Sequence, residues 1–300
     1  MKKIKTLTAF ILSLTLLPAL FACRDNETAN TPHSSFIEDD GSQSSQDSSF
    51  ESSSETEPEI PSETPSTPTP TPPSSGSTES TAPEQPTLPS NAQYIRLTGN
   101  NVNLRKGAGT DYTVLTSSKQ GTVYALSKKE GNWYKTFYRN QVVYVHTSYA
   151  AAFTLEKSTN EEVEDVIEEG YKLLGTPYVY GAVRVHDGKG KLLTGFSVQK
   201  FDCSSLIQYV FYKGAGKLLN VNTRTQVKQG KYVKASELKR GDCLFFTNEE
   251  RQYNTGVERV GHVALYLGNN YILHTASDYA CIEQISTKRW SFYIEARRFL

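Results

Sequence analysis

Residues 24–92 restrict the fold of this 300-residue chain more than any other feature, because they hold eleven of its thirteen prolines among long serine and threonine runs. The same segment has thirteen acidic residues against one basic residue, Arg24. Such a segment buries too little apolar surface to offset the entropy of ordering it. We therefore expect residues 23–93 to be a disordered acidic tether, whose reach as a flexible coil is about 45 Å.

The first 22 residues have the pattern of a leader. Lys2, Lys3 and Lys5 precede the apolar run LTAFILSLTLLPAL, which is too short and too early for an ordinary spanning helix. The run ends in LFAC, which resembles the lipobox of bacterial lipoproteins. That resemblance implies removal of residues 1–22 and lipidation of Cys23, with the membrane as a partner. An uncleaved membrane anchor is the alternative, and either product is exported and held at a membrane.

The net charge and the cysteines of the chain limit the kinds of partner and metal site that it can have. Without leader and tether, residues 93–300 carry 19 acidic and 28 basic residues, a net charge of +9. This excess is compatible with an anionic polymer such as wall material, and export argues against nucleic acid. If Cys23 is lipidated, Cys203, Cys243 and Cys281 leave at least one free thiol, and pairing of the last two stays open. No metal-spaced Cys/His set is present, so we expect no metal or cofactor, and we expect a monomer.

Residues 94–153 alternate short β-like runs with turn signals, which predicts a small all-β barrel. The stretches NVNLRKGAGTDYTVL, GNWYKTFY and YVHTSYA resemble bacterial SH3-like domains. The resemblance implies binding of wall peptide or glycan, or docking onto a catalytic neighbour. A packing spacer without a ligand is the alternative.

From residue 158 onward the pattern changes to helices followed by strands. In STNEEVEDVIEEGYKLLG, Thr159 and Glu162 are placed as a capping box, and Gly175 is placed to end the helix. Strand-like runs follow at CLFFT, HVALYLG, YILHTAS and SFYIEARRF. Helices followed by antiparallel strands predict an α+β domain over 158–300.

A second helix begins within FDCSSLIQYVFYKG. Its apolar residues recur at helical spacing, and Asp202 stands at the N-cap position. Cys203 then lies in the first turn, where free backbone N–H groups and the helix dipole favour a thiolate. A small buried hydrophobic residue is the alternative role for Cys203.

Two histidines are predicted to meet. GHVALYLGNNYILHTAS has the form strand, turn, strand, so it should pair as a hairpin. With the turn centred on Asn269, His262 and His274 share one face as diagonal neighbours. A nucleophilic cysteine needs a base, and the base needs a group that fixes its tautomer. Cys203, His262 and His274 can supply such a set.

The motifs FDCSSLIQYVF, RGDCLFF, GHVALYLG and ILHTAS resemble, in this order, the NlpC family of papain-like cell-wall cysteine peptidases. The resemblance implies that Cys203 is the nucleophile, His262 the general base and acid, and His274 the orienting residue. It also implies hydrolysis of the stem peptide of peptidoglycan, typically at the γ-D-glutamyl bond to a diamino acid. A wall amidase, an acyltransferase with the same dyad and a non-catalytic wall-binding lipoprotein are the alternatives.

The resemblance extends to residues around the nucleophile. GTPYVYGA matches the family's Tyr-x-Trp-Gly-Gly motif and puts Tyr178 near the oxyanion. Asp202 and Ser204 flank the cysteine as in members that bind a free amino terminus, although Asp202 also fits a capping role. Arg224 resembles a family arginine that could meet a substrate carboxylate, with a structural salt bridge as the alternative. The insertion VRVHDGKGKLLTGFSVQK is longer than is common in the family.

Overall fold

The computed structural model describes residues 91–275 and 278–300, which all belong to one compact unit. The predicted leader, Cys23 and most of the predicted tether lie outside these residues. Within the described part, no helix is long and apolar enough to cross a membrane. Strand β1 includes residues 91–93, the last three residues of the predicted tether.

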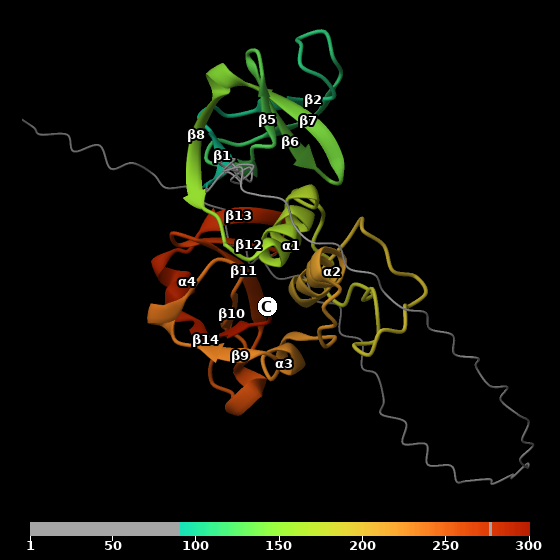
Figure 1. Ribbon diagram of the computed structural model, residues 1–300, viewed down its shortest axis with the longest axis vertical. Coiled ribbons are helices and arrows are strands. Elements are labelled where there is room, and N and C mark those ends of the chain that lie inside the picture. Colours follow the sequence, from blue (N-terminus) through green and yellow to red (C-terminus); the bar gives the residue numbers. More distant parts are fainter. Residues whose placement is uncertain (1–90, 276–277) are drawn as a thin grey trace, which may run out of the picture. The chain divides into compact units, whose positions relative to one another are not determined.

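The N-terminal half of the described chain is built from strands (Figure 1). Its elements are β1 (Asn91–Leu97), β2 (Val102–Arg105), β3 (Val114–Ser118), β4 (Val123–Ala125), β5 (Lys128–Glu130), β6 (Trp133–Tyr138), β7 (Gln141–His146), the 3-10 helix η1 (Thr147–Tyr149) and β8 (Ala150–Glu156). Five of the strands form a sheet in the order β3-β2-β7-β6-β5. The all-β prediction is therefore confirmed for this part.

The other three strands, β1, β4 and β8, pair with one another. They extend the sheet of the following domain, in the order β8-β1-β4-β13-β12-β11-β10-β14-β9. The junction is a single antiparallel register, Val123 opposite Ile282. A free edge of the second sheet is thereby covered, which removes a row of unpaired backbone groups from solvent.

The C-terminal half contains the predicted helices and antiparallel strands. Its elements are α1 (Glu161–Lys172), α2 (Cys203–Ala215), α3 (Thr223–Gln226), β9 (Lys231–Val233), η2 (Ala235–Glu237), β10 (Cys243–Phe246), η3 (Gly256–Arg259), β11 (His262–Gly268), β12 (Tyr271–Thr275), β13 (Ala280–Gln284), α4 (Thr287–Ser291) and β14 (Tyr293–Arg298). This order confirms the α+β class.

Helix α1 starts one residue later than predicted. Its N-cap is Asn160, whose side chain accepts a hydrogen bond from the backbone N–H of Glu162 at 3.0 Å. Thr159 and Glu162 therefore do not form the expected capping box, since an asparagine at the next position satisfies the free N–H.

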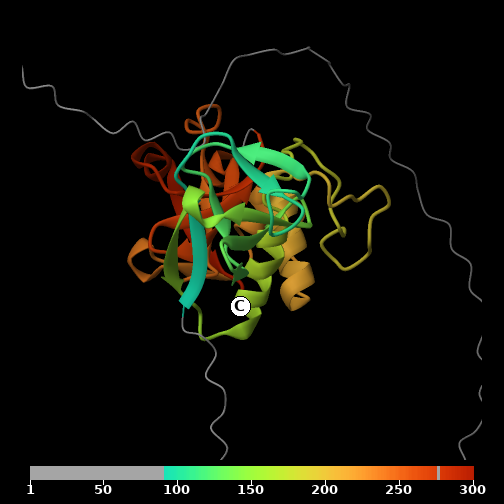
Figure 2. The same cartoon turned by 90° about the horizontal axis from the view of Figure 1, so that it is seen from above.

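Helices α1 and α2 lie side by side (Figures 1 and 2). Gly214 of α2 makes this close approach possible, because a Cβ at that position would lie 2.5 Å from the Cα of Val166 in α1. The apolar face of α2, which includes Leu206, Ile207 and Val210, is completely buried. Packing against this face fixes the position of the first residue of α2.

A buried polar network joins the two halves. Arg240 pairs with both carboxylate oxygens of Glu164 in α1, at 2.6 and 2.9 Å. The same guanidinium donates to the hydroxyls of Tyr94 in β1 and Tyr171 in α1, each at 2.9 Å, and these hydroxyls contact each other. Strand β1 is thus attached to the second domain by charge-assisted hydrogen bonds as well as by the shared sheet.

Candidate active site

Cys203 is the first residue of α2, as the sequence predicts. Asp202 caps the helix: its carboxylate accepts from the backbone N–H of Ser205 at 2.8 Å. The Ser205 hydroxyl accepts in return from the backbone N–H of Asp202 at 2.9 Å. The reciprocal cap fixes the first turn and therefore the direction of the Cys203 side chain.

The Cys203 thiol is buried, with 7% of the residue exposed, and the backbone N–H groups of Val263 and Ser204 face its sulfur. Burial and the neighbouring Asp202 carboxylate raise the pKa of Cys203 to about 12, although these N–H groups and Arg184 act in the opposite direction. Burial thus acts against the thiolate that the helix start favours. Desolvation of the anion outweighs the favourable position at the helix start.

His262 and His274 meet as the hairpin register predicts. Leu265 lies opposite Leu273, and the turn residues Asn269 and Asn270 both have positive φ. Nε2 of His262 lies 2.9 Å from Nδ1 of His274, with the two rings nearly perpendicular. Because Val263 follows His262 directly and contacts the Cys203 sulfur through its N–H, the start of β11 lies beside Cys203.

The surroundings of His262 favour its neutral form. Burial, His274 and the guanidinium of Arg289 lower the pKa of His262 well below its ordinary value. A neutral imidazole can accept a proton, so the charge state suits a general base. Both pKa shifts favour a neutral Cys203 thiol and a neutral His262 imidazole.

Sequence reasoning missed the groups behind His274. Nε2 of His274 lies 3.2 Å from Oε1 of Glu283 in β13, and Nε of Arg289 in α4 donates to the same oxygen at 2.9 Å. The sulfur of Cys281, which pairs in register with His274, lies 3.6 Å from the same Nε2. Burial raises the pKa of Glu283, but His274 and Arg289 more than offset it and bring the pKa to about 2. The alternation of CIEQ in β13 could have indicated the shared face.

The donors of His274, Cys281 and Glu283 lie within 4.8 Å of one another, a spacing that a metal ion could use. Arg289, however, already holds a positive charge against the Glu283 oxygen. A cation would have to displace this guanidinium, so the cluster fits a chain of hydrogen bonds better than a metal centre. Within residues 91–275 and 278–300, Cys203, Cys243 and Cys281 form no disulfide, so the pairing of Cys243 with Cys281 that the sequence left open is not present.

Asp202 and Ser204 are held by a group from the insertion between α1 and α2. Arg184 pairs with Asp202 at 2.8 Å and donates to the Ser204 hydroxyl at 2.9 Å. The backbone N–H of Gly181 also donates to the Asp202 carboxylate, at 3.2 Å. These contacts favour the capping role of Asp202 over contact with a substrate amine.

Two further residues predicted from the family resemblance are Tyr178 and Arg224. Tyr178 bridges to Phe201, and burial together with Cys203 and Asp202 raises the pKa of its hydroxyl, which stays protonated. Arg224 in α3 pairs with the exposed Glu258 at 3.4 Å, the structural alternative that the sequence left open.

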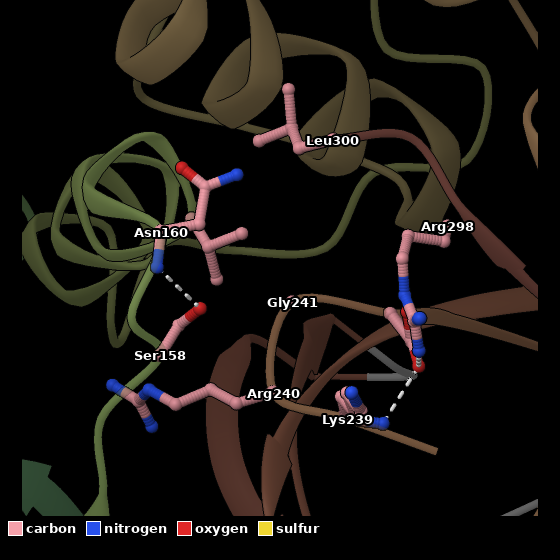
Figure 3. A pocket seen from close by; sticks show the side chains of 9 residues that line it. Ser158, Asn160, Lys239, Arg240, Gly241, Arg298 and Leu300 are labelled. Carbon is pink, nitrogen blue, oxygen red and sulfur yellow. Dashed lines mark hydrogen bonds and ion pairs between the residues drawn. The ribbon is translucent and has the colours of Figure 1, made fainter. Parts of the chain in front are cut away.

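A separate small pocket of about 160 Å³ contains none of these residues. It lies where the start of α1 meets the loop before β10 and the end of the chain, and Figure 3 shows the side chains that line it. Its buried charges are already paired, Arg240 with Glu164 and Arg298 with Asp242. The arginines that line the pocket are therefore compensated by carboxylates.

Comparison with known proteins agrees with this geometry. Residues 175–298 match the NlpC/P60 family, and residues 100–151 match the bacterial SH3 domain. The α+β domain of the described chain thus matches the NlpC/P60 model, and the all-β part before it matches the bacterial SH3 model.

Several curated proteins are similar to this chain. The gamma-D-glutamyl-L-lysine dipeptidyl-peptidase of Bacillus subtilis is 32% identical over 162 residues, which cover 54% of this chain and 47% of that protein. The peptidoglycan DL-endopeptidase CwlO of Bacillus licheniformis is 31% identical over 136 residues, covering 44% and 27%. This chain thus spans less than half the length of these relatives. A solved NLP/P60 family structure from Staphylococcus aureus has 30% identity and a TM-score of 0.39, covering 48% of this chain and 43% of that one.

Proposed function

We propose that this chain is a cell-wall cysteine peptidase that hydrolyses an amide bond in the stem peptide of peptidoglycan. The observation that carries the proposal is Cys203 at a capped helix start, beside a His262–His274 pair at 2.9 Å. The names of the relatives support the γ-D-glutamyl bond to a diamino acid as the bond that is cut.

The neutral resting state leads to a mechanism in which the proton moves as the bond forms. His262 takes the thiol proton while the Cys203 sulfur attacks the amide carbonyl. The backbone N–H groups of the α2 start and the Tyr178 hydroxyl, which remains a donor, would stabilise the oxyanion. His262 then gives its proton to the leaving amine, the C–N bond breaks and a thioester remains. Water activated by His262 hydrolyses the thioester.

The remaining parts of the chain fit an enzyme held outside the cytoplasm. We propose that Cys23 is lipidated and anchors the protein, and that the tether carries a monomeric folded part toward the wall. The SH3 domain would hold wall peptide or glycan near the catalytic domain. For Arg224 we retain contact with a substrate carboxylate, because its Glu258 partner is 61% exposed and can be exchanged for a ligand.

The test is mass spectrometry of muropeptides before and after incubation with the full chain. The wild type should release fragments cut at the γ-D-glutamyl bond, and Cys203→Ala should release none. Cys281→Ala is the matched control, because Cys281 is also buried and lies beside His274 but is not at the helix start. Cleavage at a sugar–peptide bond would identify an amidase, and cleavage by Cys203→Ala would refute the thiol mechanism.

A further inference from the structure

We propose that Glu283, held in place by Arg289, is a positioning residue that fixes the tautomer of His274 and, through it, that of the base His262. The link to catalysis rests on the proposed function, whereas the tautomers themselves can be measured without a substrate.

The geometry is that of a continuous chain of hydrogen bonds across three neighbouring strands and α4. His262 in β11, His274 in β12 and Glu283 in β13 follow one another at 2.9 and 3.2 Å, and Arg289 closes the chain at 2.9 Å. His274 is completely buried and Glu283 is 8% exposed. Water therefore competes little with these contacts, which strengthens them.

The direction of the hydrogen bonds follows from the chemistry of the last two members. Arg289 can only donate, and an ionised Glu283 can only accept. Nε2 of His274 must then carry a hydrogen, and in the neutral ring Nδ1 is an acceptor. The His262 nitrogen facing it, Nε2, becomes the donor. The lone pair of His262 is left on Nδ1, the nitrogen that is free to act as the base.

The charges around the pair predict opposite effects for the two ends of the chain. Strand β13 presents Glu283 and the thiol of Cys281, α4 presents Arg289, and β10 presents the ring of Phe246. At the start of α2, the Asp202 carboxylate lies near Cys203. The carboxylate stabilises a proton on the histidine pair, and the guanidinium opposes it. These opposite signs show that both charges act on the histidine pair, and the tautomer of His274 reports the positioning role itself.

The experiment uses the full chain labelled with ¹⁵N-histidine, with the resonances of His262 and His274 assigned from His262→Gln and His274→Gln. In the wild type, the ¹⁵N shifts should show His274 with hydrogen on Nε2. Glu283→Gln keeps an acceptor but removes the charge, so the apparent pKa of the pair should fall by about 1 unit. Arg289→Gln should raise it by about 1 unit.

Glu164→Gln is the matched control. Glu164 is a buried carboxylate paired with an arginine, like Glu283, but its partner is Arg240 and it contacts neither histidine. In Glu164→Gln, the titration curve of the His262–His274 pair should match that of the wild type, even if the variant is less stable. On a purified stem peptide, Glu283→Gln should lower kcat about tenfold with little change in KM.

Shifts of the same sign in Glu283→Gln and Arg289→Gln, or His274 with hydrogen on Nδ1 alone, would overturn the inference. Opposite shifts in a chain that cuts no muropeptide would refute the proposed function and leave the positioning role standing. If the wild type cuts muropeptides but neither variant shifts the apparent pKa of the histidine pair, the positioning role is refuted and the proposed function stands.

Discussion

Replacing Arg240 with methionine should destabilise both halves of the described chain together. Arg240 is 5% exposed on its side chain and Glu164 is 12% exposed. Removing one partner of such a buried pair costs about 3–5 kcal/mol, because the other charge stays buried without compensation. Lost hydrogen bonds to Tyr94, Tyr171 and the carbonyl of Leu267 add about 1 kcal/mol each at most. The loss should be about 5 kcal/mol, comparable to the whole stability of many domains.

Urea unfolding can follow each half separately, because one of the two tryptophans lies in each: Trp133 in β6 and Trp290 in α4. Trp133→Phe and Trp290→Phe backgrounds should report the same shift of midpoint for Arg240→Met. Adding Glu164→Gln should restore part of the loss by neutralising the orphaned carboxylate.

Arg297→Met is the control for that experiment. Arg297 is paired with Glu295 at 2.5 Å but is partly exposed, so its loss should cost less than about 1 kcal/mol. A change below 1 kcal/mol for Arg240→Met, or a shift at only one tryptophan, would show that the network does not link the two halves.

Three further predictions follow from the site and the anchor. Because the folded pKa of Glu283 is about 2 against an ordinary 4.5, its stabilisation is complete above pH 4.5 and is lost as the pH falls toward 2. Glu283→Gln should therefore reduce the dependence of unfolding free energy on pH in that window by up to about 3 kcal/mol, and an unchanged slope would contradict this. His274→Gln should keep measurable kcat/KM, whereas His262→Gln should fall to the level of Cys203→Ala, since only the base must carry the proton in turnover; equal losses would leave the roles unsupported. Cys23→Ala should release the protein from membranes or leave an unprocessed precursor, and a normally processed, membrane-bound product would rule the lipid anchor out.

The parts of the site that the sequence predicted are those set by local pattern. The start of α2 at Cys203 follows from an N-cap residue before an apolar helical stripe. The meeting of His262 and His274 follows from the tight Asn269–Asn270 turn and the β-bulge between Tyr266 and Gly268, which together place Leu265 opposite Leu273. In both cases the determining residues are within a few positions of one another.

The parts that the sequence did not predict depend on contacts between distant segments. Glu283 lies beside His274 because β13 pairs with β12, and Arg289 of α4 donates a hydrogen bond to the Glu283 carboxylate. Arg184 reaches Asp202 from an insertion with no periodic pattern. The raised pKa of Cys203 follows from burial of the thiol, which a helix position alone does not reveal.

The central claim is that Cys203 is the nucleophile of an acyl-transfer reaction. Rapid acid quench of the full chain with a purified stem peptide, followed by proteolysis and mass spectrometry, tests it directly. We expect a peptide containing Cys203 that carries the acyl half of the substrate as a thioester, and no such adduct on Cys243 or Cys281. An adduct on Cys281 would contradict this assignment. Turnover without an adduct on any cysteine, in both the wild type and Cys203→Ser, would contradict it as well.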